Sequence, residues 1–183
     1  MSLRAKRSNL VRRKTRLPRP AESGSRNDNN AGKKDTAVLG IGNPLMSDEG
    51  IGIHLIRKLS EHQDKFPSVE FIDAGTGGMN VLHLIANRKK VIIIDCVKMG
   101  NKPGTIKRFE PADVQTVKKM MHFSLHEADI LRIIELSRQL GECPDQIVIF
   151  GIEPESLELG QKLSITLSGK IDAYSADILK ELC

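Results

Sequence analysis

Four residues whose side chains suit acid–base or metal chemistry each stand after a short apolar segment or at the start of a helical pattern: Glu49, Asp73, Asp95 and His126. Because the carboxyl ends of parallel strands meet at one edge of a sheet, we expect these side chains to lie close together. Carboxylate oxygens and an imidazole nitrogen are suitable ligands for zinc, nickel or manganese, with positions left for water or substrate. The spacing of these residues in the sequence is irregular, and it is their common edge that favours a metal site.

Each of these residues also has a purely structural interpretation. Asp48 and Glu49 stand at the start of a helical pattern, where the helix dipole favours carboxylates. Asp73 and Asp95 suit turns, in which their side chains accept hydrogen bonds from nearby main-chain N–H groups. His126 could simply be exposed at the start of its helix. Only their common position at one edge favours a site over these alternatives.

The glycine-rich turn before Asp48 raises the alternative of a phosphate-binding loop. The segment 40–45 (Gly-Ile-Gly-Asn-Pro-Leu) lacks the third glycine of a dinucleotide fingerprint, and no Gly-Lys-Ser/Thr follows it. A pair of carboxylates at the helix start would also repel a phosphate. With one Tyr, five Phe and no Trp, the chain offers few aromatic rings for stacking on nucleic acid. We therefore expect neither a nucleotide nor a nucleic acid as ligand.

The other histidines and cysteines are interpreted as packing residues. His54 and His83 lie among Leu and Ile in helical patterns, which predicts partial burial. Cys96 follows Asp95 and is expected to pack beneath it as a small apolar group, since no base for a nucleophilic role is evident. The three cysteines form no C-x-x-C pair, and their odd number favours a reducing compartment, which is the cytoplasm.

The net charge of +5 comes from the N-terminal segment. Residues 1–35 carry 11 Lys and Arg against three Asp and Glu, and they lack hydrophobic periodicity. This composition predicts a disordered basic tail before a single domain at 36–183, with an electrostatic contact to RNA, a membrane or an acidic partner as the alternative. No apolar run approaches the ~18–20 residues that cross a bilayer. We expect a soluble cytoplasmic monomer without a membrane partner.

Short apolar runs alternate with helical periodicity from residue 36 onward, which indicates an α/β domain. The expected strands are 36–42, 69–72, 91–94, 105–109 and 147–150, and the expected helices are 48–61, 79–85, 126–139 and 167–182. The uninterrupted apolar run Val91–Ile94 indicates a strand covered on both faces, at the centre of a parallel sheet. The fold class is therefore a three-layer α/β/α sandwich with a parallel or mostly parallel sheet.

Five segments in order carry a family resemblance: Gly42–Gly52, Asp73–Gly78, Asp95 with Pro103–Thr105, Ser124–His126 and Gly151–Leu157. From about Ala37 to its end, the chain resembles the hydrogenase maturation proteases, which are nickel-dependent endopeptidases that complete the large subunit of nickel–iron hydrogenases. The second segment reads Asp-Ala-Gly-Thr where the family pattern is Asp-Gly-Gly-Thr, so Ala74 is a departure that we expect to alter only turn geometry.

The resemblance implies a twisted five-stranded sheet between helices, with one antiparallel strand that would suit residues 105–109. It implies that Glu49, Asp95 and His126 contact the metal and that Asp73 is a further functional aspartate. The implied substrate is a large-subunit precursor that already carries nickel and loses a short C-terminal extension. The nickel ion would come with this precursor, although other divalent metals could occupy the site.

The implied mechanism places catalysis on Glu49, Asp73 and Asp95. Glu49 or Asp73 would activate water as general base, and the metal would polarise the scissile carbonyl or only position the bond. The alternative is a noncatalytic assembly factor that binds nickel precursors through the same edge. A third interpretation is a related peptidase that acts on a different protein. A precursor that binds but keeps its mass would indicate the assembly factor.

Overall fold

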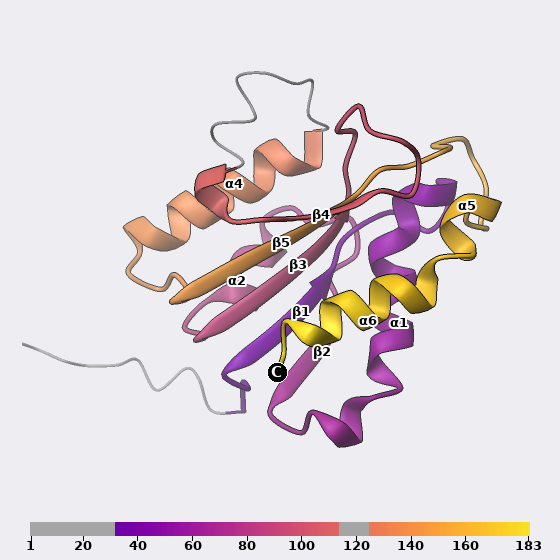
Figure 1. Cartoon of the computed structure of the whole chain (residues 1–183). Coiled ribbons are helices and arrows are strands. Elements are labelled where there is room, and N and C mark those ends of the chain that lie inside the picture. Colours follow the sequence, from indigo (N-terminus) through magenta and orange to yellow (C-terminus); the bar gives the residue numbers. More distant parts are fainter. Residues whose placement is uncertain (1–31, 114–124) are drawn as a thin grey trace, which may run out of the picture.

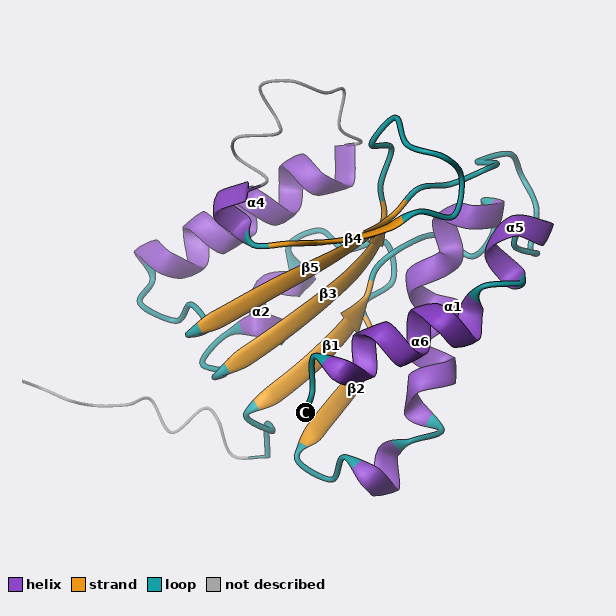
Figure 2. Ribbon diagram, viewed as in Figure 1, coloured by secondary structure: helices purple, strands orange, loops and turns teal. Residues whose placement is uncertain are grey.

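The computed structural model describes residues 32–113 and 125–183, which form a five-stranded sheet between layers of helices (Figure 1). In order across the sheet, the strands are β2 (Val69–Asp73), β1 (Thr36–Gly40), β3 (Lys90–Cys96), β5 (Gln146–Ile152) and β4 (Ile106–Phe109). The neighbouring pairs among the first four are parallel, and β4 is antiparallel to β5 (Figure 2). The predicted sheet, with its one antiparallel strand, is confirmed.

Helices cover both faces of the sheet. One face carries α2 (Asn80–Ile85) and α4 (Leu125–Gln139), and the other carries α1 (Ile51–Ser60), α5 (Ile165–Ser168) and α6 (Ile171–Lys180). Because side chains alternate along a strand, β3 supplies both cores. Val91 and Ile93 pack with α2 and α4, whereas Ile92 and Ile94 pack with α1 and α6. The chain therefore forms the predicted three-layer sandwich.

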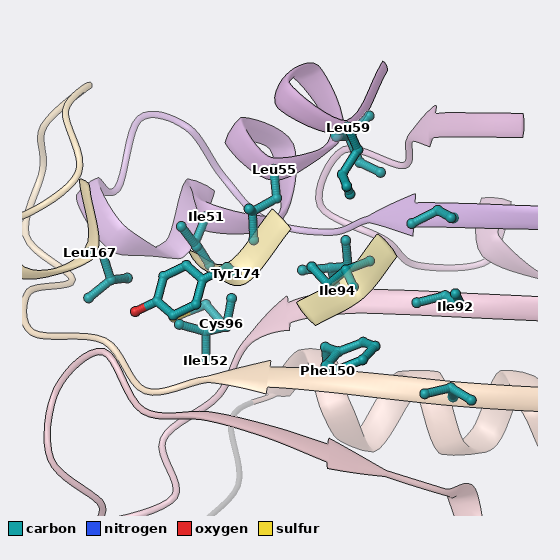
Figure 3. Packing of buried hydrophobic residues seen from close by; sticks show 14 of the residues in the cluster. Ile51, Leu55, Leu59, Ile92, Ile94, Cys96, Phe150, Ile152, Leu167 and Tyr174 are labelled. Atoms are coloured by element: carbon teal, nitrogen blue, oxygen red, sulfur yellow. The ribbon is translucent and has the colours of Figure 1, made fainter. Parts of the chain in front are cut away.

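The core under α1 explains why this helix lies where it does. Ile51, Leu55 and Leu59 recur every four residues and are fully buried, so they form one apolar stripe. Figure 3 shows these side chains over the sheet, close to Ile94 and Tyr174. Burying such side chains contributes about 1.5–3 kcal/mol each. The stripe holds the N-terminal end of α1, and with it the turn that carries Glu49, against the sheet.

Several element boundaries differ from those expected. The predicted helix 48–61 begins as a 3₁₀ turn, η2 (Ser47–Gly50), and continues as α1. A further 3₁₀ turn, η3 (Gln63–Lys65), follows. The predicted helix 167–182 is two helices, because α5 ends at Ser168 with Gly169 as its C-cap, and α6 starts at Ile171. Ser164 is the N-cap of α5, since its Oγ accepts the Leu167 N–H at 3.3 Å.

Other expectations meet mixed outcomes. Most of the predicted tail lies outside the described residues, which begin at Gly32. The prediction that His83 is partly buried is wrong, because it occupies the outward face of α2 and is exposed. Across residues 32–113 and 125–183, no helix combines the length and apolar character needed to cross a membrane.

Candidate functional site

The strand order creates a crevice at the carboxyl ends of β1 and β3. The chain leaves β1 towards β2 on one side, then returns to place β3 on the other side of β1 and β5 beyond it. The connection that follows β1 and the connection that follows β3 therefore lead to opposite sides of the sheet. Open α/β sheets bind ligands in the crevice between two such strands. In the register of these strands, Gly40 pairs with Ile94, so the residues that follow them share one edge.

Two glycines bring η2 down onto this edge. A Cβ at Gly42, where φ is +147°, would overlap the main-chain carbonyl of Glu49, and a Cβ at Gly52 would overlap those of Ile41 and Ile94. Only residues without side chains allow this approach at both points. The glycines of the segment 42–52 therefore serve close packing, and they place half-buried Glu49 above the end of β3.

Asp95 is the most perturbed side chain at this edge. It is 1% exposed, and its Oδ1 accepts the N–H of Cys96 at 2.8 Å. Its Oδ2 is buried and receives no hydrogen bond from any residue that the structure describes. Burial, and to a smaller extent the negative charge of nearby Glu49, raise the pKa of Asp95 to about 7 against the opposing effect of the bond from Cys96. An oxygen in this state suits a proton or a cation.

Asp73 lies at the same edge but in a different environment. It ends β2, pairs with Gly40 in the register with β1, and is exposed. Its Oδ1 accepts the Gly75 N–H at 2.9 Å, which is the turn interaction expected of an aspartate there. Ala74 directs its methyl group into the core with α2 and α4, so this departure from the family pattern fills apolar space.

His126 lies in the first turn of α4. Six residues separate the end of this helix from β5, and the helix runs back along that strand, so its first turn lies towards the carboxyl edge of the sheet (Figure 1). The position of the His126 side chain lies outside what the structure describes, and the predicted metal-contacting trio therefore stays a prediction. Among the side chains described, no three of His, Cys, Asp and Glu are grouped to hold a metal ion.

Sequence reasoning missed the buried carboxylates of Asp48 and Glu153. Asp48 accepts three main-chain N–H groups from residues 155–164 instead of serving the helix dipole. Glu153 accepts the N–H groups of Met99 and Asn101, at 2.7 and 3.0 Å, and so fixes the loop after β3. The segment Gly151–Leu157 belongs to the family resemblance, and its acidic residues were the available signal for a buried carboxylate there.

The packing predictions for Cys96 and His54 are confirmed. Cys96 is 7% exposed and lies in the cluster between α1 and the sheet (Figure 3). His54 is half-buried on α1, and both its burial and the nearby Arg57 lower its pKa. A lowered pKa keeps the imidazole neutral, as a packing histidine should be.

Comparisons with known proteins agree on one family. The HycI family model, described as hydrogenase maturation protease, matches residues 53–183. Hydrogenase 2 maturation protease of Escherichia coli is 35% identical over 148 residues, which are 79% of this chain and 88% of that protein. Hydrogenase expression/formation protein HupD of Rhodobacter capsulatus is 32% identical over 146 residues, which are 79% of this chain and 70% of that protein.

A solved structure shares both the sequence and the fold. The hydrogenase maturating endopeptidase HybD from E. coli superimposes with a TM-score of 0.71 at 31% identity, covering 80% of this chain and 91% of that one. Some curated relatives are longer, and the chain spans 60% of the length of hydrogenase expression/formation protein HoxM of Cupriavidus necator, with 32% identity over 121 residues.

Proposed function

This chain belongs to the hydrogenase maturation protease family, and from that premise we propose that it is an endopeptidase for a nickel–iron hydrogenase large subunit. It removes a short C-terminal extension from the nickel-loaded precursor and thereby completes maturation. The observation that carries this proposal is the Oδ2 of Asp95, a buried carboxylate oxygen without a partner among the described residues, beside Glu49 at the crevice.

Nickel enters with the substrate and serves to recognise it. The carboxylates of Glu49 and Asp95 are hard anionic donors, and the imidazole of His126 is the proposed third ligand. A cation would supply the partner that the Oδ2 of Asp95 lacks, and it would favour ionised over protonated Asp95. A precursor without nickel would lose this anchor and escape cleavage. Other divalent metals with the same ligand preferences could occupy the site.

The chemistry is addition of water to the scissile peptide carbonyl. Glu49 or Asp73 takes a proton of the attacking water as general base and then returns it to the leaving nitrogen, so the tetrahedral intermediate breaks down to a new C-terminal carboxyl group and the amine of the released extension. Asp73 is exposed at the neighbouring strand end, so it can approach a bound peptide, whereas half-buried Glu49 lies next to Asp95. The substrate's metal would polarise the carbonyl if the peptide bond lies within its reach.

We place this reaction in the cytoplasm and expect the enzyme to act as a monomer. Support for the compartment comes from Cys96, Cys143 and Cys183, all of which are free thiols. Free thiols persist under reducing conditions, whereas secreted proteins of this size commonly form disulfides.

The test is co-expression with each hydrogenase large-subunit precursor of the source genome, followed by intact-mass measurement with and without nickel. We expect a nickel-dependent loss of a short C-terminal peptide from one precursor. Asp95→Asn should abolish this loss, because it removes the carboxylate at the crevice. The control is Asp172→Asn, which should preserve cleavage because the side chain of Asp172 is 90% exposed on α6. A stable complex with unchanged precursor mass would indicate the assembly factor instead.

A further inference from the structure

The carboxylate of Asp48 holds together two segments that are far apart in the sequence. Its side chain is fully buried. Oδ2 accepts the N–H groups of Glu155 at 2.9 Å and Ser156 at 3.0 Å, and Oδ1 accepts that of Ser164 at 2.7 Å. Three such bonds satisfy a buried carboxylate, because bonds to a charged acceptor are the strong ones. The segment 155–164 is thus anchored at both ends by one side chain.

Main-chain bonds join the same segment to the turn that contains Asp48. The N–H of Asp48 donates to the carbonyl of Ser156 at 3.1 Å, and the N–H of Ser47 donates to the carbonyl of Gly160 at 2.7 Å. Gly160 in turn donates to the carbonyl of Leu45 at 2.9 Å. Residues 45–48 and 155–164 therefore form one hydrogen-bonded unit, in which the Asp48 carboxylate is the only described side chain that reaches across to main-chain N–H groups.

Glu49 is the next residue along this unit. Its N–H donates to the carbonyl of Met46 at 3.1 Å, and its own carbonyl lies against Gly42. Because Asp48 and Glu49 are consecutive in a 3₁₀ turn, their side chains leave the turn in different directions. The Asp48 side chain enters the segment 155–164, whereas the charge of Glu49 acts on Asp95.

We infer that Asp48 is a positioning residue, which holds Glu49 in its place beside Asp95 by fixing the segment 155–164 to η2. The inference rests on the proposed function, since it assigns Asp48 a part in that reaction. It differs from a purely structural role in one respect. Loss of the carboxylate should lower the turnover of molecules that remain fully folded, because the turn that carries Glu49 is then held less firmly relative to the bound precursor.

Asp48→Asn is the direct test. An amide offers one acceptor oxygen and one NH₂ donor, so either Ser164 or the pair Glu155 and Ser156 must face a donor. We expect kcat for cleavage of the purified nickel-loaded precursor to fall about tenfold or more, with KM changed less than about threefold. Assays are run well below the unfolding midpoint of the variant, so that loss of folded enzyme does not contribute.

Arg88→Gln is the matched control for loss of buried hydrogen bonds. Arg88 is a buried charged residue that also makes three bonds, to the carbonyls of Leu84 and Lys34 at 2.6 and 2.7 Å and to Glu70 at 2.7 Å. It precedes β3 and therefore lies at the opposite edge of the sheet. We expect this variant to unfold at a lower temperature and to keep the wild-type kcat.

A second pair of variants tests the inference without changing Asp48. Ser164 has φ −55°, which proline can adopt, so Ser164→Pro removes the N–H that donates to Asp48 with little change of backbone. Ser164→Ala loses the same side-chain cap but retains that N–H. We expect a lower kcat for the proline variant than for the alanine variant, and faster amide hydrogen exchange at residues 46–50 in the proline variant alone.

The outcomes separate the inference from the proposed function. Absence of cleavage by the wild-type enzyme on every precursor would overturn the proposed function. Cleavage by the wild-type enzyme, together with an unchanged kcat in folded Asp48→Asn and in Ser164→Pro, would overturn the positioning role alone. A fall in kcat that Arg88→Gln reproduces would also overturn it, because the effect would then follow any loss of buried bonds.

Discussion

Replacing Asp95 by asparagine should make the metal-free protein more stable, compared with the wild type at the same pH, as the pH rises from acidic to neutral. This holds even though the change removes a residue of the candidate site. The reason is the environment of the carboxylate. It is buried, it accepts one main-chain N–H, and its second oxygen receives no bond from the described residues. These conditions favour the protonated form and raise the pKa of Asp95 from 3.8 to about 7.

The sign and size of the effect follow from proton linkage. Between pH 3.8 and about 7, the native state binds a proton at Asp95 that the unfolded state has lost, so the free energy of unfolding falls as pH rises. Each pH unit in this window is worth about 1.4 kcal/mol, which gives about 4 kcal/mol at most across it. Asparagine carries no titrating proton, so the free energy of unfolding of the variant does not fall with pH in this way.

Urea unfolding in EDTA, at a series of pH values from about 4 to 8, measures the effect. The free energy of unfolding of Asp95→Asn, minus that of the wild type, should increase by up to about 4 kcal/mol over this series. Because only the change of this difference with pH is evaluated, any pH-independent cost of burying the amide cancels. Ile94→Val is the matched control, because it lies next to Asp95 and costs about 1 kcal/mol without titrating. A difference for Asp95→Asn that stays flat with pH would refute the reasoning.

Two further changes test other parts of the fold. Glu181 should show the opposite pH dependence, because its bond to Arg108 lowers its pKa and Lys90 adds to this effect. The stability that ionised Glu181 provides is therefore present above its ordinary pKa of 4.5 and is lost as the pH falls through the lower pKa of the folded state. Urea unfolding should therefore find Glu181→Gln destabilised at neutral pH and equal to the wild type in strong acid, and a deficit that persists in acid would contradict the assignment. Gly52→Ala should lower the free energy of unfolding by about 3 kcal/mol in the same assay, because its Cβ would overlap two main-chain carbonyls. Gly169→Ala is the control and should cost under about 1 kcal/mol, because the nearest atom to an added Cβ is 3.3 Å away and φ is −68°.

The fold class could be predicted from the sequence because its signals are local. Val91–Ile94 is apolar without interruption, and a strand buried on both faces requires that pattern. The stripe Ile51, Leu55 and Leu59 likewise follows from helical geometry. The antiparallel direction of β4 has no such local signal, and it was expected only through the family resemblance.

The candidate site could be predicted only in part. Topology alone gathers Glu49, Asp73 and Asp95 at the carboxyl edge, because each follows or ends a parallel strand. The role of Asp48 has no local signal, since its partners Glu155 and Ser164 are 107 and 116 residues away in the sequence. The effect of a helix dipole on Asp48 depends only on its own turn, whereas bonds across that distance exist only in the packed fold.

The structure describes three buried carboxylates near the crevice, which differ in how fully they are satisfied, and this difference favours one of them as a group that binds a ligand. Asp48 accepts three main-chain N–H groups and Glu153 accepts two. Asp95 accepts one, and its second oxygen has no partner among the described residues. A buried charge without partners destabilises a fold, so a carboxylate in that state gains most from a cation or proton that arrives from outside. We therefore propose that Asp48 and Glu153 maintain the shape of the crevice and that Asp95 is the carboxylate that would meet the metal of the precursor.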